Sequence, residues 1–100
     1  MPAAVTPTPD VILYARPGCG LCDETRTVLR ALRDERRDLR VSVPRLVERD
    51  ISEDPDLERR FFDRIPVVEI GHRRLELAVG PAKLRRLLLE ALDVASPGVR

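Results

Sequence analysis

The only two cysteines of the chain, Cys19 and Cys22, stand three positions apart in the segment VILYARPGCGLC, which covers residues 11–22. A short apolar run precedes them and ends at Pro17 and Gly18, and a helical pattern of apolar residues begins between them. A dithiol where a strand meets a helix is typical of redox sites, and the same spacing occurs in metal sites. The pair therefore predicts thiol–disulfide chemistry or metal binding.

The two thiols have different expected roles. Cys19 falls just before the first helical turn, where free backbone N–H groups and the helix dipole favour the thiolate and lower the thiol pKa. The carboxylates of Asp23 and Glu24 would oppose this effect if they lie near the sulfur. Cys22 lies one turn further into the helix and is expected to be more buried. We expect Cys19 to attack a disulfide and Cys22 to resolve the mixed disulfide.

The number of ligands argues against a structural zinc site within one chain. Such a site needs four ligands, usually Cys or His, whereas this chain has two cysteines and one histidine, His72. His72 follows Gly71 in a predicted hairpin turn, remote from the cysteines. No metal ligands are therefore predicted. A further alternative is that the two thiols only pack as small apolar groups in the core.

Composition and charge limit the other functions that the chain could have. Its 100 residues include 18 Lys and Arg and 17 Asp and Glu, which leave a net charge of +1, and only 3% are aromatic. This balance does not favour binding to nucleic acid or to an acidic membrane surface. No apolar run approaches the ~18 residues of a membrane span, and the first ten residues lack the pattern of a secretory signal. We expect a monomer in the cytoplasm, where thiols stay reduced.

The elements that must position the cysteines follow from hydrophobic periodicity and from Pro and Gly. A helical pattern starts at Leu21 and dissolves in the charged run 34–40, which we interpret as a solvated helix end and loop. We place a strand after Pro44, because proline has no backbone N–H and a residue inside an interior strand must donate one to its neighbour. Asp54 and Pro55 are typical of a helix start. The predicted strands are residues 11–15, 45–49, 66–70 and 73–77, and the predicted helices start at Leu21, Pro55 and Pro81.

The order of these elements, βαβαββα, predicts the fold class. A helix between the first two strands implies a parallel pair, and the hairpin at Gly71 and His72 implies an antiparallel pair. The chain is therefore an α/β protein with a mixed sheet flanked by helices. We predict one domain over residues 10–93, between disordered tails at residues 1–9 and 94–100.

Together these features resemble the glutaredoxin-like branch of the thioredoxin superfamily. The resemblance rests on LYARPGCGLC after the first strand, on DIS-DP before the short helix and on Arg64-Ile65-Pro66-Val67-Val68, and it covers roughly residues 10–92. It implies a four-stranded mixed sheet, a dithiol at the N-terminus of the first helix and a cis peptide bond at Ile65-Pro66 opposite that dithiol. The implied activity is that of a disulfide oxidoreductase with Cys19 and Cys22 as catalytic residues.

The resemblance also implies which residues would contact a substrate. Arg16 matches a position where glutaredoxins carry a lysine, and it would add positive charge beside the dithiol. Leu21 stands between the cysteines, where many glutaredoxins have an aromatic residue. With Arg64, Ile65 and Pro66, these two residues form the predicted substrate-binding set.

The implied partners are a disulfide-containing protein or glutathione, with a thioredoxin-type reductase as a further electron donor. No cofactor is predicted, and glutathione would be a co-substrate. Residues 77–81, LAVGP, stand where the family has a Gly-Gly and an acidic residue that hold glutathione. Two alternatives stay open beside the enzyme: a non-catalytic redox sensor or adaptor, and an iron–sulfur cluster shared between two protomers, as in some glutaredoxins.

Overall fold

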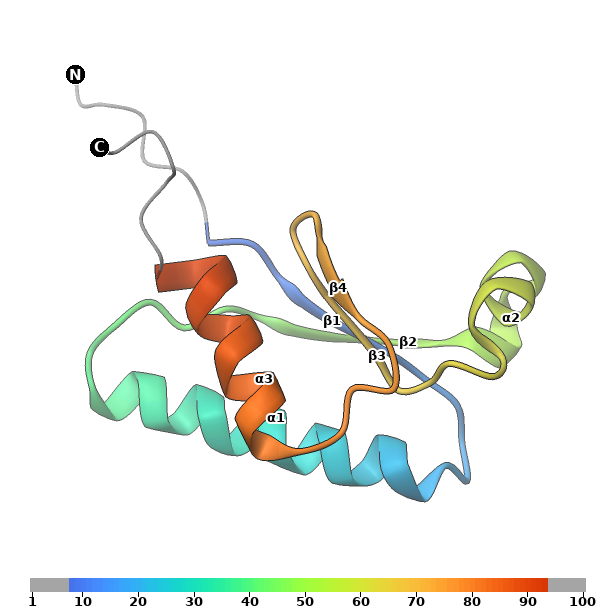
Figure 1. Cartoon of the computed structure of the whole chain (residues 1–100), viewed down its shortest axis with the longest axis horizontal. Helices are drawn as coiled ribbons and strands as arrows, with labels where there is room; N and C mark the ends of the chain where they lie inside the picture. Colours follow the sequence, from blue (N-terminus) through green and yellow to red (C-terminus); the bar gives the residue numbers. More distant parts are fainter. Residues whose placement is uncertain (1–7, 94–100) are drawn as a thin grey trace.

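The computed structural model describes residues 8–93, and its element order is the predicted βαβαββα (Figure 1). A 3-10 turn at Ile51–Glu53 precedes the second helix, and a π-helical turn at Leu89–Asp93 extends the third. The predicted tails, 1–9 and 94–100, lie outside the described residues except for residues 8 and 9, which have no regular structure. The elements are β1 (Val11–Ala15), α1 (Gly20–Asp38), β2 (Leu46–Asp50), α2 (Pro55–Phe61), β3 (Val67–Ile70), β4 (Arg73–Leu75) and α3 (Pro81–Leu88).

The four strands form one mixed sheet in the order β2-β1-β3-β4. β1 runs parallel to β2, whereas β3 is antiparallel to both β1 and β4. The α/β fold with a four-stranded mixed sheet is therefore confirmed. The register pairs Tyr14 with Val67, so β3 starts at the end of the sheet where β1 finishes. The loop that carries the cysteines leaves β1 at this same end.

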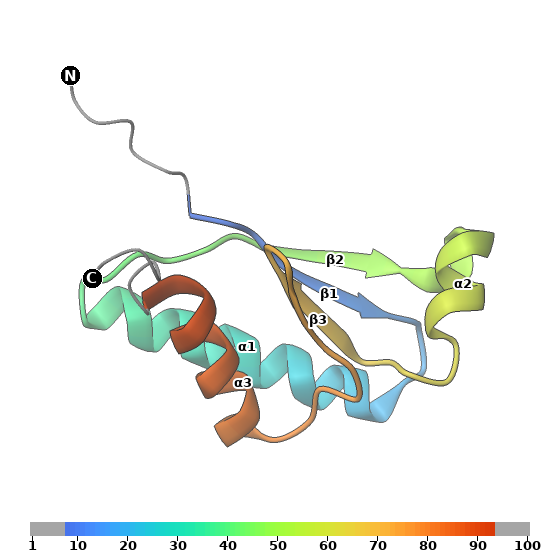
Figure 2. The ribbon, with the colours of Figure 1, turned by 45° about the horizontal axis from the view of Figure 1, so that its top comes forward.

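The sheet is covered on both faces, because successive strand residues point to opposite sides. Val11, Leu13 and Ala15 of β1 pack with α1 and α3, which lie together on one side of the sheet (Figure 2). Tyr14 of β1 packs on the other face against α2, where its ring centroid is 4.8 Å from that of Phe61. The buried members of the larger cluster are Val11, Leu13, Ala15, Cys22, Leu29, Leu32, Val68, Ile70, Ala78, Leu84, Leu87 and Leu88.

The short helix α2 begins where its sequence predicts. Asp54 Oδ1 accepts hydrogen bonds from the backbone N–H groups of Asp56, at 2.9 Å, and Leu57, at 3.4 Å. Pro55 occupies the first turn, where its missing N–H costs nothing. Leu57 and Phe61, one turn apart, are both buried. The side-chain cap at Asp54 therefore stabilises the start of the helix, and the burial of Leu57 and Phe61 holds the helix against the core.

The end of the long helix α1 agrees with the prediction except at one residue. The run 34–40, expected to be a solvated helix end and loop, is helical as far as Asp38 and then turns, and its residues are exposed except for Arg36. Arg36, inside this run, is 6% exposed and donates two hydrogen bonds of 2.7 Å to the carboxylate of Asp93. A charged side chain can be buried when it is paired in this way. The pair ties the end of α1 to the last described turn.

Four strand boundaries differ by one or two residues from the predictions. β2 covers Leu46–Asp50 instead of residues 45–49, and β3 begins after Pro66, which has no N–H to donate to the ladder. β4 ends at Leu75 instead of residue 77. Leu77 has a φ of 48°, a left-handed conformation that an extended strand excludes. The returning strand is shorter because the chain turns towards α3 at this point.

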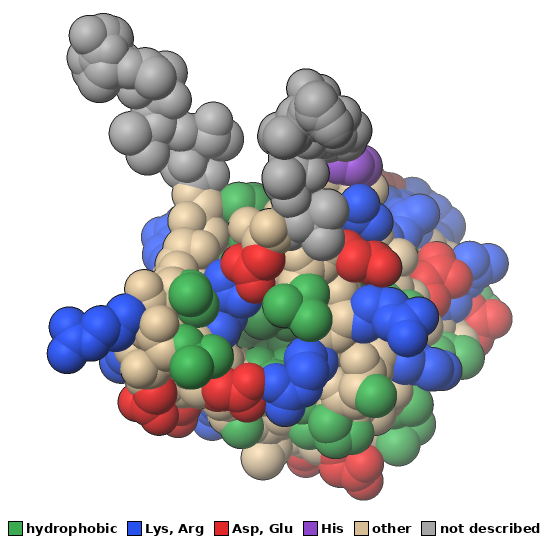
Figure 3. All heavy atoms as spheres, turned by 60° about the vertical axis from the view of Figure 1, so that its left-hand side comes forward, with side chains coloured by type: hydrophobic (Ala, Val, Ile, Leu, Met, Phe, Trp, Pro, Cys, Tyr) green, Lys and Arg blue, Asp and Glu red, His purple; other side chains and the backbone are tan. Residues whose placement is uncertain are grey.

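The end of the molecule remote from the cysteines exposes apolar side chains among charged ones. Leu39, Val41 and Leu89 are exposed beside a hollow of about 120 Å³, and Figure 3 looks onto this end, where apolar and charged side chains alternate. With 19 residues, α1 is roughly 28 Å long, which separates this surface from the dithiol. Within the described part of the chain, none of the helices combines the length and apolarity needed to cross a bilayer.

Candidate functional site

The loop between β1 and α1 places both cysteines at the N-terminus of the long helix. Gly18 has a φ of 79°, which a residue with a side chain rarely adopts, and it turns the chain into α1. Cys19 is the N-cap residue, and its Sγ accepts a hydrogen bond of 3.1 Å from the backbone N–H of Cys22. The two residues are joined in a disulfide, with their Cα atoms 5.2 Å apart. The oxidised form of the predicted dithiol is thus compatible with this helix start.

The two sulfur-bearing residues differ in exposure. Cys22 is completely buried and belongs to the larger core cluster. Cys19 is half-buried at the edge of the same cluster, and Ile65 packs against that cluster as well. An incoming sulfur can therefore approach Cys19, whereas Cys22 can react only with a partner that is already at Cys19. The expectation that Cys22 is the more buried of the two is therefore confirmed, whereas the division of roles stays a prediction.

The acidic residue in the first turn of α1, Asp23, shares a counter-ion with Glu48 of β2. Asp23 accepts a hydrogen bond of 2.7 Å from Arg26. Arg26 also donates a 2.8 Å hydrogen bond to Glu48 of β2, which lowers the pKa of that carboxyl group. The guanidinium group of Arg26 is shared by the two carboxylates, so it compensates the charge of Asp23 only in part. The opposition of Asp23 to a thiolate at Cys19 is correspondingly weaker than the bare sequence suggests.

Both predicted substrate-binding arginines are engaged with acidic residues of the chain. Arg16 forms an ion pair with Glu58 of α2, and its Nε is buried with no hydrogen-bond partner among the described residues. Arg64 donates to both carboxylate oxygens of Glu76, at 3.1 and 3.2 Å, and is 3.6 Å from Asp63. Each arginine is partly exposed. A substrate carboxylate would have to compete with these internal partners.

Pro66 lies at the end of the sheet from which the cysteine loop departs. The peptide bond between Ile65 and Pro66 is cis, and Pro66 is fully buried. Because Tyr14 pairs with Val67, the position of Pro66 in the sheet lies next to Ala15, the last residue of β1. Only residues 16–18 separate β1 from Cys19. Pro66 and the dithiol therefore share one end of the sheet.

A hydrogen-bond chain that the sequence did not predict links this end to α1. The hydroxyl of Thr25, one turn after Cys22, donates a buried 2.6 Å hydrogen bond to the carbonyl oxygen of Ala78. The N–H of Ala78 in turn donates to the carbonyl of Pro66 at 2.8 Å. The sequence did contain one signal for this bond: Thr25 stands on the apolar face of α1. A buried hydroxyl needs a hydrogen-bond partner, so a partner elsewhere in the chain could have been expected. The loop 77–81 thus joins the first turns of α1 to the proline.

Apolar groups are exposed on the segments that meet near the dithiol. Leu21, between the cysteines, is 49% exposed, and Leu77, whose N–H donates to the carbonyl of Arg64 at 2.9 Å, is 53% exposed. Phe62, at the end of α2, is 59% exposed, whereas its neighbour Phe61 is in the core. The i, i+4 spacing of Leu57 and Phe61 predicts that Phe61 is buried with Leu57, and the structure confirms this.

The histidine takes no part in this arrangement. His72 is exposed in the turn between β3 and β4, as the hairpin prediction placed it. Within residues 8–93, no group of three His, Cys, Asp or Glu side chains is placed so that it could hold a metal ion.

Comparisons with known proteins agree with this geometry. The family described as Glutaredoxin-like domain (DUF836) matches residues 10–92. The X-ray structure of Northeast Structural Genomics target protein XcR50 from X. campestris is similar at 27% identity and a TM-score of 0.65, over 81% of this chain and 97% of that one. The solution NMR structure of protein Ne2328 from Nitrosomonas europaea matches in fold, at 23% identity and a TM-score of 0.63, over 85% and 96%. No curated protein sequence matches this chain.

Proposed function

Because this chain belongs to the glutaredoxin-like domain family (DUF836), we propose that it is a thiol–disulfide oxidoreductase that uses Cys19 and Cys22. Family membership and the CxxC pair support a thiol redox role in general. The more specific proposal is that the reduced dithiol opens disulfides in other molecules. It acts as a monomer in a reducing compartment such as the cytoplasm, where its own disulfide can be reduced again.

The single observation that carries the proposal is the unequal burial of the two cysteines at the start of α1. Cys19 is partly accessible at the N-cap, whereas Cys22 is fully buried one turn later. In the reduced protein, the backbone N–H groups of the first turn and the helix dipole stabilise a thiolate at Cys19. A pair that only stabilised the fold would need neither the accessible sulfur nor its position at a helix end.

The reaction proceeds in two exchanges that balance sulfur and electrons. The Cys19 thiolate attacks one sulfur of the substrate disulfide, forms a mixed disulfide and releases the first substrate thiolate. Cys22 then loses its proton, attacks the Cys19 sulfur and releases the second substrate thiolate. The substrate has gained two electrons, and Cys19 and Cys22 are left as the disulfide. The Cys19–Cys22 disulfide is reduced again by two electrons, either from two glutathione molecules, which become glutathione disulfide, or from the dithiol of a thioredoxin-type reductase, which becomes a disulfide.

A disulfide within an apolar protein segment is the substrate that the surroundings of Cys19 favour. Leu21 is exposed between the cysteines, and Ile65 is partly exposed before β3, so an apolar segment can dock beside the sulfur. The side chain of Pro66 is buried and is not available for this contact. Arg16 and Arg64 already have carboxylate partners within the chain. A glutathione carboxylate would have to displace one of these partners, so glutathione suits the role of reductant better than that of tightly bound substrate.

The test compares Cys19→Ser with Cys22→Ser. With glutathione or a thioredoxin-type reductase as donor, the unchanged protein should reduce a small disulfide and an insulin disulfide with many turnovers. Cys19→Ser should abolish both reactions. Cys22→Ser should keep the first exchange and accumulate a mixed disulfide at Cys19, visible as an added mass that dithiothreitol removes.

Two results would contradict the proposal. Full activity of Cys19→Ser would mean that Cys19 is not the attacking residue. A single reaction per molecule, with no turnover under either donor, would indicate a redox sensor in place of an enzyme. In that case the oxidised and reduced forms should differ in what they bind.

A further inference from the structure

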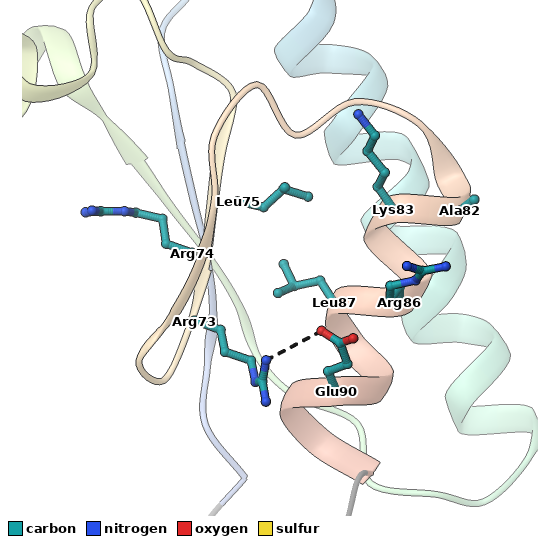
Figure 4. Close-up of a pocket in the computed structure, with 8 residues that line it drawn as sticks. All are labelled: Arg73, Arg74, Leu75, Ala82, Lys83, Arg86, Leu87 and Glu90. Carbon is teal, nitrogen blue, oxygen red and sulfur yellow. Dashed lines mark hydrogen bonds and ion pairs between the residues drawn. The ribbon is translucent and has the colours of Figure 1, made fainter.

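A groove between β4 and α3 lies outside the segments that form the dithiol site. It has a volume of about 610 Å³. Leu75 of β4 and Leu87 of α3 point towards each other across it and form an apolar floor (Figure 4). Charged residues of both elements surround this floor. None of the lining residues belongs to the cysteine loop, to residues 64–66 or to the loop 77–81.

The rim of the groove carries an excess of positive charge. Arg73 is 3.5 Å from Glu90, the only acidic residue in the lining, and the two largely compensate each other. Lys83 and Arg86 are exposed on α3 and form no ion pair with any residue in the range 8–93. By contrast, the neighbouring Arg85 is paired with Glu35 of α1. Two uncompensated cations therefore remain, although the whole chain has a net charge of only +1.

The strand beside this groove is at the edge of the sheet. β4 has three residues and, in the described part of the chain, pairs only with β3. Its outer edge therefore presents backbone N–H and C=O groups without strand partners, and an extended peptide can add to such an edge. Alternate side chains of the added strand would point towards the α3 side, where the apolar floor and the cations of α3 lie.

We propose that this groove docks an extended acidic segment of a partner protein, which adds to the edge of β4. Backbone hydrogen bonds to β4 would supply the binding register, and Lys83 and Arg86 would pair with its carboxylates. Apolar side chains of the same segment would cover Leu75 and Leu87. A second copy of β4 is a poor occupant, because Arg73 and Arg74 would then face like charges.

The docking surface is independent of the reaction proposed for the dithiol. A partner held at β4 leaves Cys19 accessible, so binding and disulfide reduction can be measured separately. Docking would retain a partner beside the protein while a disulfide elsewhere in that partner reaches the sulfur. The inference survives even if the dithiol proves to be a sensor.

The probe for the test is a fluorescein-labelled peptide of ten residues in which Glu alternates with Val. Fluorescence anisotropy with the full chain should show saturable binding that weakens as NaCl is raised from 50 to 500 mM. The double change Lys83→Glu and Arg86→Glu should weaken binding at least tenfold. The matched control reverses two exposed arginines on other helices, Arg30→Glu and Arg59→Glu, and should bind within twofold of the unchanged protein. Circular dichroism checks that both variants fold.

Two further probes separate strand addition from simple charge attraction. The same peptide with alternate backbone amides N-methylated keeps its charge but cannot form the ladder, and it should bind at least tenfold more weakly. Hydrogen exchange at the amides of β4 should slow when the unmodified peptide is bound. The proposal is overturned if no peptide binds, if the control variant loses as much affinity as the groove variant, or if the methylated peptide or inorganic tripolyphosphate binds equally well.

Discussion

Replacing the buried hydroxyl of Thr25 by a methyl group should test whether the loop 77–81 is held to α1 by one hydrogen bond. Thr25 is 1% exposed, and its hydroxyl donates to the carbonyl oxygen of Ala78 at 2.6 Å. Thr25→Val conserves the shape of the side chain and leaves the Ala78 carbonyl without this donor. The two residues are 53 positions apart, so the bond exists only in the folded chain.

The expected loss in the free energy of unfolding is about 1–3 kcal/mol, the usual cost of leaving a buried polar group without its partner. The added apolar methyl group offsets part of this loss, so we expect a value towards the lower end. For a domain of this size, each kcal/mol lowers Tm by about 4–8 °C. Urea denaturation followed by circular dichroism gives the free energy, and thermal melting gives the shift.

The matched control is Thr27→Val, which makes the same chemical change at an exposed position of the same helix. It should change the free energy of unfolding by less than about 0.5 kcal/mol. Thr25→Ser keeps the hydroxyl and should be more stable than Thr25→Val. If Thr25→Val is as stable as the unchanged protein, or loses no more than Thr27→Val, the hydrogen bond does not hold this loop.

Three further changes test other parts of the structure. Arg40 has a φ of 60°, a conformation that costs a residue with a side chain about 1–2 kcal/mol. The greater chain entropy of glycine offsets part of this, so Arg40→Gly should stabilise the protein by up to about 1 kcal/mol in urea denaturation; a loss would contradict the left-handed assignment. Arg36 lowers the pKa of Asp93, so this pair contributes stability above the usual Asp pKa of about 3.9, which is lost as the pH falls through the lower folded pKa. Asp93→Asn should remove that acid dependence from Tm measured between pH 2 and 7, and an unchanged pH profile would exclude the pair as its cause. Phe61→Ala should cost about 3–5 kcal/mol, because the ring is 1% exposed and packs on Tyr14; a cost below 1 kcal/mol would mean that the second core cluster is not needed.

The parts of the fold that the sequence predicted well are those with local signals. β1 covers the residues expected from its apolar run between Asp10 and Arg16, and α2 starts at the predicted cap, Asp54. The element order then required a parallel pair and a hairpin, and both are present. In each case the deciding information lies within a few residues of the element itself.

The end of α1 shows why other parts could not be predicted. The N–H of Val41 donates to the carbonyl of Arg36, and the N–H of Arg40 donates to that of Arg37, both at 3.1 Å. This is the hydrogen-bond pattern with which helices commonly end at a glycine, but here Arg40 takes the left-handed position. The sequence therefore contains no stop signal. The partner that allows Arg36 to be buried, Asp93, is 57 residues away.

The ion-pair partners of the arginines at the candidate site could not be predicted from the sequence either, and they affect which substrate the site can bind. Considered alone, Arg16 and Arg64 were two free cations near the dithiol, suited to hold a carboxylate. Their partners, Glu58 and Glu76, are 42 and 12 residues away, and only the fold brings them together. Such partly exposed pairs are weak, on the order of 1 kcal/mol or less, so a substrate carboxylate can still displace them. The pairs therefore lower the affinity for a small anionic substrate without blocking it, while apolar contact at Leu21 is unaffected. This difference is the reason why we propose protein disulfides as the substrates of this site.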